Sequence, residues 1–196
     1  MQGENTSTPQ MGTPQTGTPQ GTADGLDDET IAFARRVFGF ARGGLARELD
    51  ELLAMGLPPN LRNEKGDSLL MLASYHGHAD AVRALLDRGA DPDLANDRGQ
   101  TPLAGAAFKG DLAVVRLLLD RGAAADGRSD GGRTPLMMAA MFNRTDIVDL
   151  LLAHGADPEA RDGAGHNART AAEAMGAPDT PGQLARLAAN GGEGGP

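Results

Sequence analysis

Residues 99–123 read GQTPLAGAAFKGDLAVVRLLLDRGA, and the pattern of this stretch occurs three times in the chain at a spacing of 33 residues. A fixed period of this length is typical of a solenoid, in which similar units stack on their neighbours. Weaker half-copies flank the repeats in the same register, at residues 43–62 and 162–176. The three full blocks align without gaps and cover residues 63–95, 96–128 and 129–161.

Each block predicts two helices joined by a short loop. In the central block, the Thr101 hydroxyl can cap a helix N-terminus, and Pro102 suits the first helical position. Gly110 and Asp111 separate this helix from a second segment, whose regularly spaced valines and leucines give a wide apolar face. Gly122 follows as a C-terminal glycine that can adopt a positive φ. The pattern therefore indicates a helix–loop–helix unit that ends in a turn.

The sequence resembles the ankyrin repeat family over roughly residues 30–189. The segments GQTPL (99–103) and GRTPL (132–136) match the start of the family motif, and LLDRGAD (85–91) and LLAHGAD (151–157) match its end. The resemblance implies an all-α solenoid of stacked helix-turn-helix units with short β-turn or hairpin tips.

Three features depart from the family pattern. The usual His after T-P-L is replaced by Met71, Ala104 and Met137 in the three blocks, which removes a hydrogen-bonding group. The usual Ala-Asp after the final glycine is Ala-Ala at residues 123–124. Asn143 replaces the interhelical glycine of the third block, and Asn still tolerates the left-handed conformation.

The blocks lie between expected caps and expected flexible ends. We expect an ankyrin domain at residues 27–189, with caps at 27–62 and 162–189. The first cap should begin with a helix at residues 27–42, because its apolar residues have helical spacing. Flanking segments rich in Pro, Gly and polar residues lack the apolar side chains for a core. We therefore expect a disordered TPQ-rich tail at residues 1–26 and a flexible end at residues 190–196.

Composition excludes several classes of function. The net charge of -9 argues against a nucleic-acid or anionic-membrane surface, because phosphates require clustered basic residues. The chain has no Cys, and its longest apolar run, PLMMAAMF at 135–142, is too short to span a membrane. The N-terminus shows no secretory signal, so a cytoplasmic protein is expected. Sixteen Arg against two Lys, with abundant Ala and Gly, suggest a GC-rich bacterial genome.

The sequence also indicates that the protein is not an enzyme. His76 and His78 form a short H-x-H motif, but no further ligands converge on it in sequence. The segment DPDLANDRG (91–99) lacks the ligand spacing of a calcium loop, so its Asp residues are interpreted as turn formers. No nucleophile–base spacing and no phosphate-binding lysine motif is present. We expect no catalytic residue, cofactor or bound metal.

Candidate partner-binding residues are those that differ between blocks at fixed repeat positions, since the framework positions are occupied by packing. The resemblance places turn tips and first helices along a concave groove. The tip candidates are Glu64, Lys65, Asp67, Asp97, Arg98, Gln100, Asp130 and Arg133. The helix-end candidates, rich in aromatic rings and Met, are Tyr75, His76, Phe108, Lys109, Met141 and Phe142.

Two interpretations of the ring-bearing strip remain open. Aromatic anchors favour partner binding, and Met adapts to irregular partners. The alternative is that the rings pack between neighbouring repeats. Under the binding interpretation, Phe108→Ala should weaken binding and leave the melting midpoint nearly unchanged.

The resemblance implies a non-catalytic scaffold that binds a partner protein of unknown identity through the groove. Some bacterial proteins that resemble this chain assist enzymes, catalase-type antioxidant enzymes among them, so an accessory role is one expectation. The alternatives are an exported effector or neutralising module, and a ligand- or metal-binding regulator. Nothing in the sequence requires self-association, so a monomer is expected.

Overall fold

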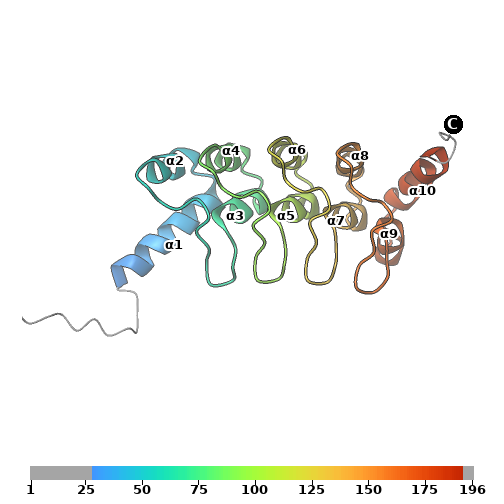
Figure 1. Ribbon diagram of the computed structural model, residues 1–196, viewed down its shortest axis with the longest axis horizontal. Helices are drawn as coiled ribbons and strands as arrows, with labels where there is room; N and C mark the ends of the chain where they lie inside the picture. The colour runs from blue at the N-terminus through green and yellow to red at the C-terminus, as the bar shows by residue number, and fades with distance from the viewer. Residues whose placement is uncertain (1–27, 192–196) are drawn as a thin grey trace, which may run out of the picture.

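The computed structural model describes residues 28–191, which form a row of ten helices with long loops along one edge (Figure 1). The expected tail at residues 1–26 lies outside this range. Within the described residues, the β-structure is one isolated bridge between Arg62 and Ser68, so the expected all-α solenoid is confirmed. The helices are α1 (Asp28–Gly43), α2 (Ala46–Ala54), α3 (Leu69–Tyr75), α4 (Ala79–Asp87), α5 (Pro102–Lys109), α6 (Leu112–Asp120), α7 (Pro135–Met141), α8 (Thr145–Ala153), α9 (Ala168–Met175) and α10 (Thr180–Gly191).

The first helix of each full repeat begins where the hydroxyl pattern predicts. The side chains of Ser68, Thr101 and Thr134 accept hydrogen bonds from backbone N–H groups three residues ahead, at 3.0, 3.3 and 3.2 Å. These bonds satisfy amides that a helix N-terminus would otherwise leave unpaired. Pro102 and Pro135 follow the two threonines at the first helical position.

The reversal between paired helices uses left-handed backbone. Gly77, Gly110 and Asn143 occupy equivalent positions with φ of 77°, 85° and 56°. Asn143 is the one described non-glycine residue with positive φ. Its side chain also reaches α10: Oδ1 accepts hydrogen bonds from the backbone N–H groups of Asp179 and Thr180 at 2.9 and 3.1 Å. Asn143 therefore attaches the last helix to the third repeat.

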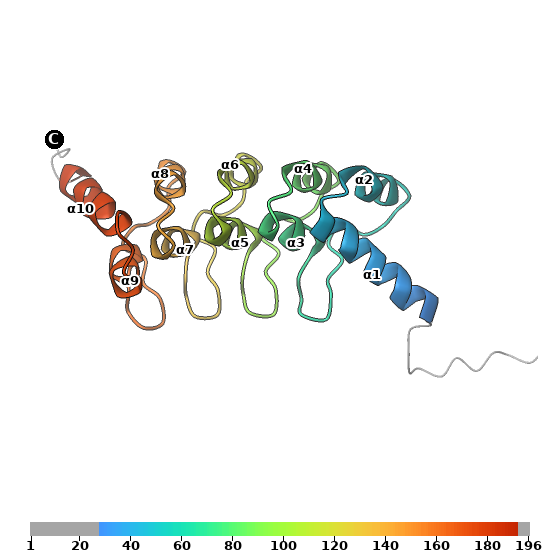
Figure 2. The same ribbon diagram turned by 180° about the vertical axis from the view of Figure 1, so that it is seen from behind.

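The helices form two layers. The inner layer comprises α3, α5, α7 and α9, and the outer layer comprises α2, α4, α6 and α8, which lie above the inner layer in both views (Figures 1 and 2). One continuous apolar core runs between the layers along the row. Equivalent positions are fully buried in all three repeats, which confirms the 33-residue register. They are Leu70, Leu103 and Leu136 in the inner layer, with Val82, Val115 and Val148 and then Leu85, Leu118 and Leu151 in the outer layer.

Charged side chains link successive outer helices near their C-terminal ends. Asp50 accepts a hydrogen bond from Arg88 at 2.7 Å, and Asp87 accepts one from Arg121 at 2.6 Å. The Arg88 hydrogen bond lowers the pKa of the Asp50 carboxyl, and the pKa of Arg88 is raised in return. In each pair the Arg of a D-R dipeptide bonds an Asp of the preceding outer helix, so this Arg joins one repeat to the next.

The two ends differ from the interior. Helix α1 buries Val37 and Phe38 against the first repeat. At the other end, Asn167 caps α9 through a reciprocal pair of hydrogen bonds with Thr170. Helix α10 continues to Gly191, so its last two residues lie in the segment expected to be flexible from residue 190. No helix among residues 28–191 combines the length and the apolar character that crossing a membrane requires.

Candidate partner-binding groove

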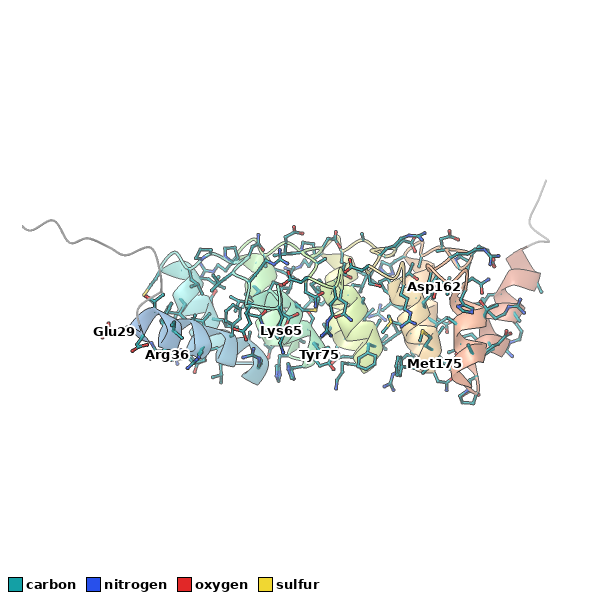
Figure 3. The ribbon with its side chains drawn as sticks, turned by 90° about the horizontal axis from the view of Figure 1, so that it is seen from below. Glu29, Arg36, Lys65, Tyr75, Asp162 and Met175 are labelled. Carbon is teal, nitrogen blue, oxygen red and sulfur yellow. The ribbon has the colours of Figure 1, made fainter. Side chains whose placement is uncertain are left out.

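A groove with a volume of about 820 Å³ runs along the inner helices and the loops that precede them. Figure 3 shows this face, with the loops along one edge and the C-terminal ends of the inner helices along the other. Eight of the fourteen candidate residues line the groove: Lys65, Asp67, Tyr75, His76, Arg98, Gln100, Phe108 and Arg133.

The other six candidates lie beside the groove. Asp97 forms a 3.0 Å ion pair with Arg62. Lys109 lies 5.1 Å from the centre of the Tyr75 ring. The remaining four are outside the lining. Glu64 and Asp130 are exposed loop carboxylates, and Met141 and Phe142 are half-buried at the C-terminal end of α7.

The loop tips are held in place by side-chain hydrogen bonds to the backbone. The Asn63 amide oxygen accepts from the backbone N–H groups of Lys65 and Asp67, both at 2.9 Å. Asn96 does the same for Arg98 and Gln100 in the next loop, at 3.0 Å each. These turns fix the loop backbone, so the variable side chains project from defined positions.

Successive loops are also bonded to one another. The backbone N–H of Asp97 donates to the Lys65 carbonyl at 3.2 Å, and that of Asp130 donates to the Arg98 carbonyl at 3.2 Å. Gly163 continues the series by donating to Gly131 at 2.8 Å. The loop edge of the groove is therefore a connected surface across four loops.

The groove contains both signs of charge, but its carboxylates are already engaged. Asp67 accepts a 2.8 Å hydrogen bond from the side-chain amide of Asn96. Burial alone would raise the pKa of Asp162, but backbone hydrogen bonds from His166 and Ala164, with the charges of His166 and Arg133, hold it below its ordinary value. Arg133 lies 3.9 Å from this carboxylate.

Aromatic side chains cross the groove edge at the helix ends. Tyr75 stacks on Phe108 with ring centres 6.0 Å apart, and Phe142 meets Phe108 edge to face at 4.5 Å. Tyr75 remains 38 % exposed, whereas Phe108 is half-buried. The rings thus pack between neighbouring repeats, as the packing interpretation expects. Tyr75 also faces solvent, as the binding interpretation expects. Phe108 contacts both neighbours, so we now expect its removal to affect stability as well.

The histidine pair lies at the N-terminal end of this aromatic strip. The rings of His76 and His78 are stacked with centres 6.2 Å apart. Partial burial lowers the pKa of His76, and the nearby charges of His78, Lys109 and Arg42 lower it further. His78 bonds the Arg42 carbonyl through Nε2 at 2.8 Å, which links the first repeat to α1. Across residues 28–191, no group of three or more His, Asp or Glu residues is arranged to hold a metal ion.

The apolar floor of the groove was not among the sequence candidates. Leu72, Gly105 and Met138 occupy one equivalent repeat position, and all three line the groove. Met71 and Ala104 line it from the preceding position. Both positions differ between blocks, so the variation criterion could have found them. They were missed because candidates were sought at turn tips and helix ends.

The fold and groove define a repeat protein of the ankyrin type. The family model for ankyrin repeats (three copies) matches residues 40–129 and 70–162, so the chain belongs to the ankyrin repeat family. An ankyrin repeat protein of Pseudomonas aeruginosa is 66% identical to the chain over 58 residues, which are 30% of this chain. The match spans 34% of that protein, about a third of its length.

Proposed function

We propose that the protein is a non-catalytic module that binds a partner protein through the groove. Ankyrin repeats generally mediate protein–protein interaction, and this family is typically non-catalytic. The observation that carries the proposal is the groove itself, whose lining changes from repeat to repeat over a repeated framework. Lys65, Tyr75, Arg98, Phe108 and Arg133 supply the charged and aromatic contacts.

The cellular setting belongs to the same proposal. We infer a bacterial, cytoplasmic monomer, with assistance to an enzyme as one role for such a module. The basis is the composition of the chain and the resemblance described above. Neither the exported-module alternative nor the metal-regulator alternative has a specific observation in its favour among the described residues.

The test compares two double variants of the full chain as bait for binding partners. Tyr75→Ala with Arg98→Ala alters the groove, whereas Arg83→Ala with Arg116→Ala alters exposed positions on α4 and α6 behind it. Proteins retained by each bait are quantified by mass spectrometry. We expect a partner that the wild type and the rear variant retain and the groove variant loses. Equal loss from both variants would contradict a groove-based module, as would substrate turnover by the purified protein.

A further inference from the structure

Two cationic side chains of the groove are available to pair with an acidic ligand. Lys65 and Arg98 occupy equivalent loop positions, line the groove, and are exposed. Among the described residues, neither side chain forms an ion pair. The two groove carboxylates have the partners given above: Asp67 is bonded to Asn96, and Asp162 to loop amides and near Arg133. The groove lining has three cations, Lys65, Arg98 and Arg133, against two carboxylates, so its balance is positive on a chain whose net charge is -9.

The floor of the groove is lowest at the central repeat. Large side chains stand in the first and third repeats at the position of Gly105, namely Leu72 and Met138. At the preceding position the central repeat has Ala104, where the first has Met71. The small pair in α5 leaves a shallow notch in the groove floor, bounded on one side by the Met71 sulfur and the Tyr75 ring.

Neither backbone geometry nor packing explains the glycine in this notch. Gly105 lies inside helix α5 and is not among the residues with positive φ. A Cβ placed on it would meet the Met71 sulfur at 3.4 Å and Tyr75 at 3.7 Å, which are ordinary contacts. A glycine in a helix interior is less favourable than alanine. The residue thus lowers helix stability and adds no side chain to the centre of the groove floor.

Together these features define what the groove accepts. We propose that it binds an extended acidic segment of a partner protein, with one large apolar side chain of that segment seated over Ala104 and Gly105. The carboxylates of the segment pair with Lys65 and Arg98 along the loop edge. This inference rests on the proposed function and specifies the chemistry of the partner.

The size of the groove sets the length of a suitable probe. Packed helices lie about 8–10 Å apart, so three successive inner helices span about 20 Å between their axes. An extended chain rises about 3.3 Å per residue, so six to nine residues cover the three repeats and their edges. Random twelve-residue peptides displayed in a library are therefore long enough to span the three repeats.

The experiment selects peptides from this library on the immobilised full chain and measures the affinity of the selected peptides for variants. We expect selected sequences with Asp or Glu on both sides of one large apolar residue. Lys65→Glu with Arg98→Glu should weaken their binding at least tenfold. Arg83→Glu with Arg116→Glu makes the same change of charge at exposed, equivalent positions on α4 and α6, and should leave the affinity within about threefold.

Substitutions of Gly105 test whether the notch receives a side chain of the partner. Gly105→Met restores the side chain of the third repeat and should weaken the selected peptides at least tenfold. Gly105→Ala should weaken them less, while raising the melting midpoint by about 2–4 °C through helix propensity. Gly39→Ala is the control, because a Cβ there meets nothing within 4 Å and the residue lies in α1 outside the groove. It should leave peptide affinity unchanged.

Each outcome separates this inference from the proposed function. If neutral or basic peptides bind the wild type and lose affinity for Gly105→Met, the partner segment is not acidic, but the groove remains the binding site. Acidic peptides that bind all notch variants equally would overturn the seat over Gly105. An oligothymidylate of twelve nucleotides that binds as tightly as the selected peptides would replace the protein segment with a nucleic acid. Peptides whose affinity no groove variant changes would overturn both proposals.

Discussion

At the scale of single residues, the repeat copies act as internal controls for one another. Where two blocks have alanine and the third has a polar residue at the same position, the alanine copies show how the site packs without the polar group. Ser74 is such a position, since Ala107 and Ala140 are its equivalents. All three are fully buried, but the Ser74 hydroxyl has no hydrogen-bond partner among the residues that the structure describes.

We expect Ser74→Ala to raise the free energy of unfolding by about 1 kcal/mol, because it removes a buried, unpaired hydroxyl. Urea denaturation of the full chain measures the change. Ser68→Ala is the matched control: its hydroxyl caps α3, so its loss should lower stability by about 1 kcal/mol. A destabilised Ser74→Ala variant would show that the hydroxyl is satisfied in solution.

Asp162 makes a pH-dependent contribution to stability. The pKa of its carboxyl is lower in the folded protein than in the unfolded chain. Its stabilising effect is therefore present above the unfolded pKa of about 3.9 and is lost as pH falls through the folded value. Asp162→Asn should remove this part of the acid sensitivity, while keeping the two loop hydrogen bonds that Asn63 and Asn96 make in earlier repeats.

Denaturation curves of the two proteins between pH 7 and pH 3 provide the test. The stability of the wild type relative to Asp162→Asn should fall as the solution is acidified toward pH 3. Parallel curves would mean that the Asp162 carboxyl has the same pKa folded and unfolded. Asp130→Asn changes an exposed carboxylate in the neighbouring loop and controls for the loss of one negative charge.

At the scale of helices, neighbouring inner helices contact one another through the aromatic strip as well as through the leucine core. The ring of Phe108 on α5 lies between Tyr75 of α3 and Phe142 of α7. Edge-to-face and stacked pairs add to the free energy of simple burial. The strip therefore joins three repeats at one end of their inner helices.

Phe108→Ala should lower the free energy of unfolding by about 2 kcal/mol, since the ring is half-buried and forms two aromatic contacts. Thermal and urea denaturation measure the loss. Phe33→Ala removes a ring that is 37 % exposed on α1 and should cost less than half as much. An unchanged midpoint for Phe108→Ala would assign the ring to binding alone.

At the scale of the whole molecule, stability depends on contacts between successive repeats. The central repeat has neighbours on both sides, so its core supports both halves of the row. Leu118 is fully buried there, and Leu85 and Leu151 are its equivalents in the adjacent repeats. Loss of this side chain weakens two interfaces at once.

We expect Leu118→Ala to lower the free energy of unfolding by roughly 2–5 kcal/mol. Leu187→Ala is the control, because that side chain is 43 % exposed on the last helix. Circular dichroism during urea denaturation follows both. A wild-type transition for Leu118→Ala would contradict the burial of this position.

The sequence predicted the fold because the signal is repeated. Three aligned copies show that Thr101 and Thr134 begin helices and that Gly110 ends one, and the structure confirms each assignment. Contacts outside the period were harder to predict. Asn143 was interpreted as a glycine substitute, but its bonds to Asp179 and Thr180 join residues 36 and 37 positions apart.

The groove was predicted in part for a related reason. Variation between copies identified the tip residues, but it does not indicate which variable positions face the same space. Gly105 looks like a helix imperfection in the sequence, and its place between Leu72 and Met138 becomes evident when the repeats are stacked. The contact of Phe142 with Phe108 likewise depends on how neighbouring helices are oriented.

The ion pairs behind the repeats have a consequence for assembly. Each pair is head to tail, with the carboxylate from one repeat and the cation from the next, so the series has no symmetry that would close it. Heterologous contacts of this kind generate filaments when another copy can continue them. The third full repeat has Ala153 where the earlier ones have Asp87 and Asp120, and its outer helix α8 instead bonds α10 through Asp149, which accepts from the Gln183 side chain at 2.7 Å. The C-terminal cap thus ends the series of Asp–Arg pairs with a neutral amide donor and occupies the face on which a further repeat would continue it.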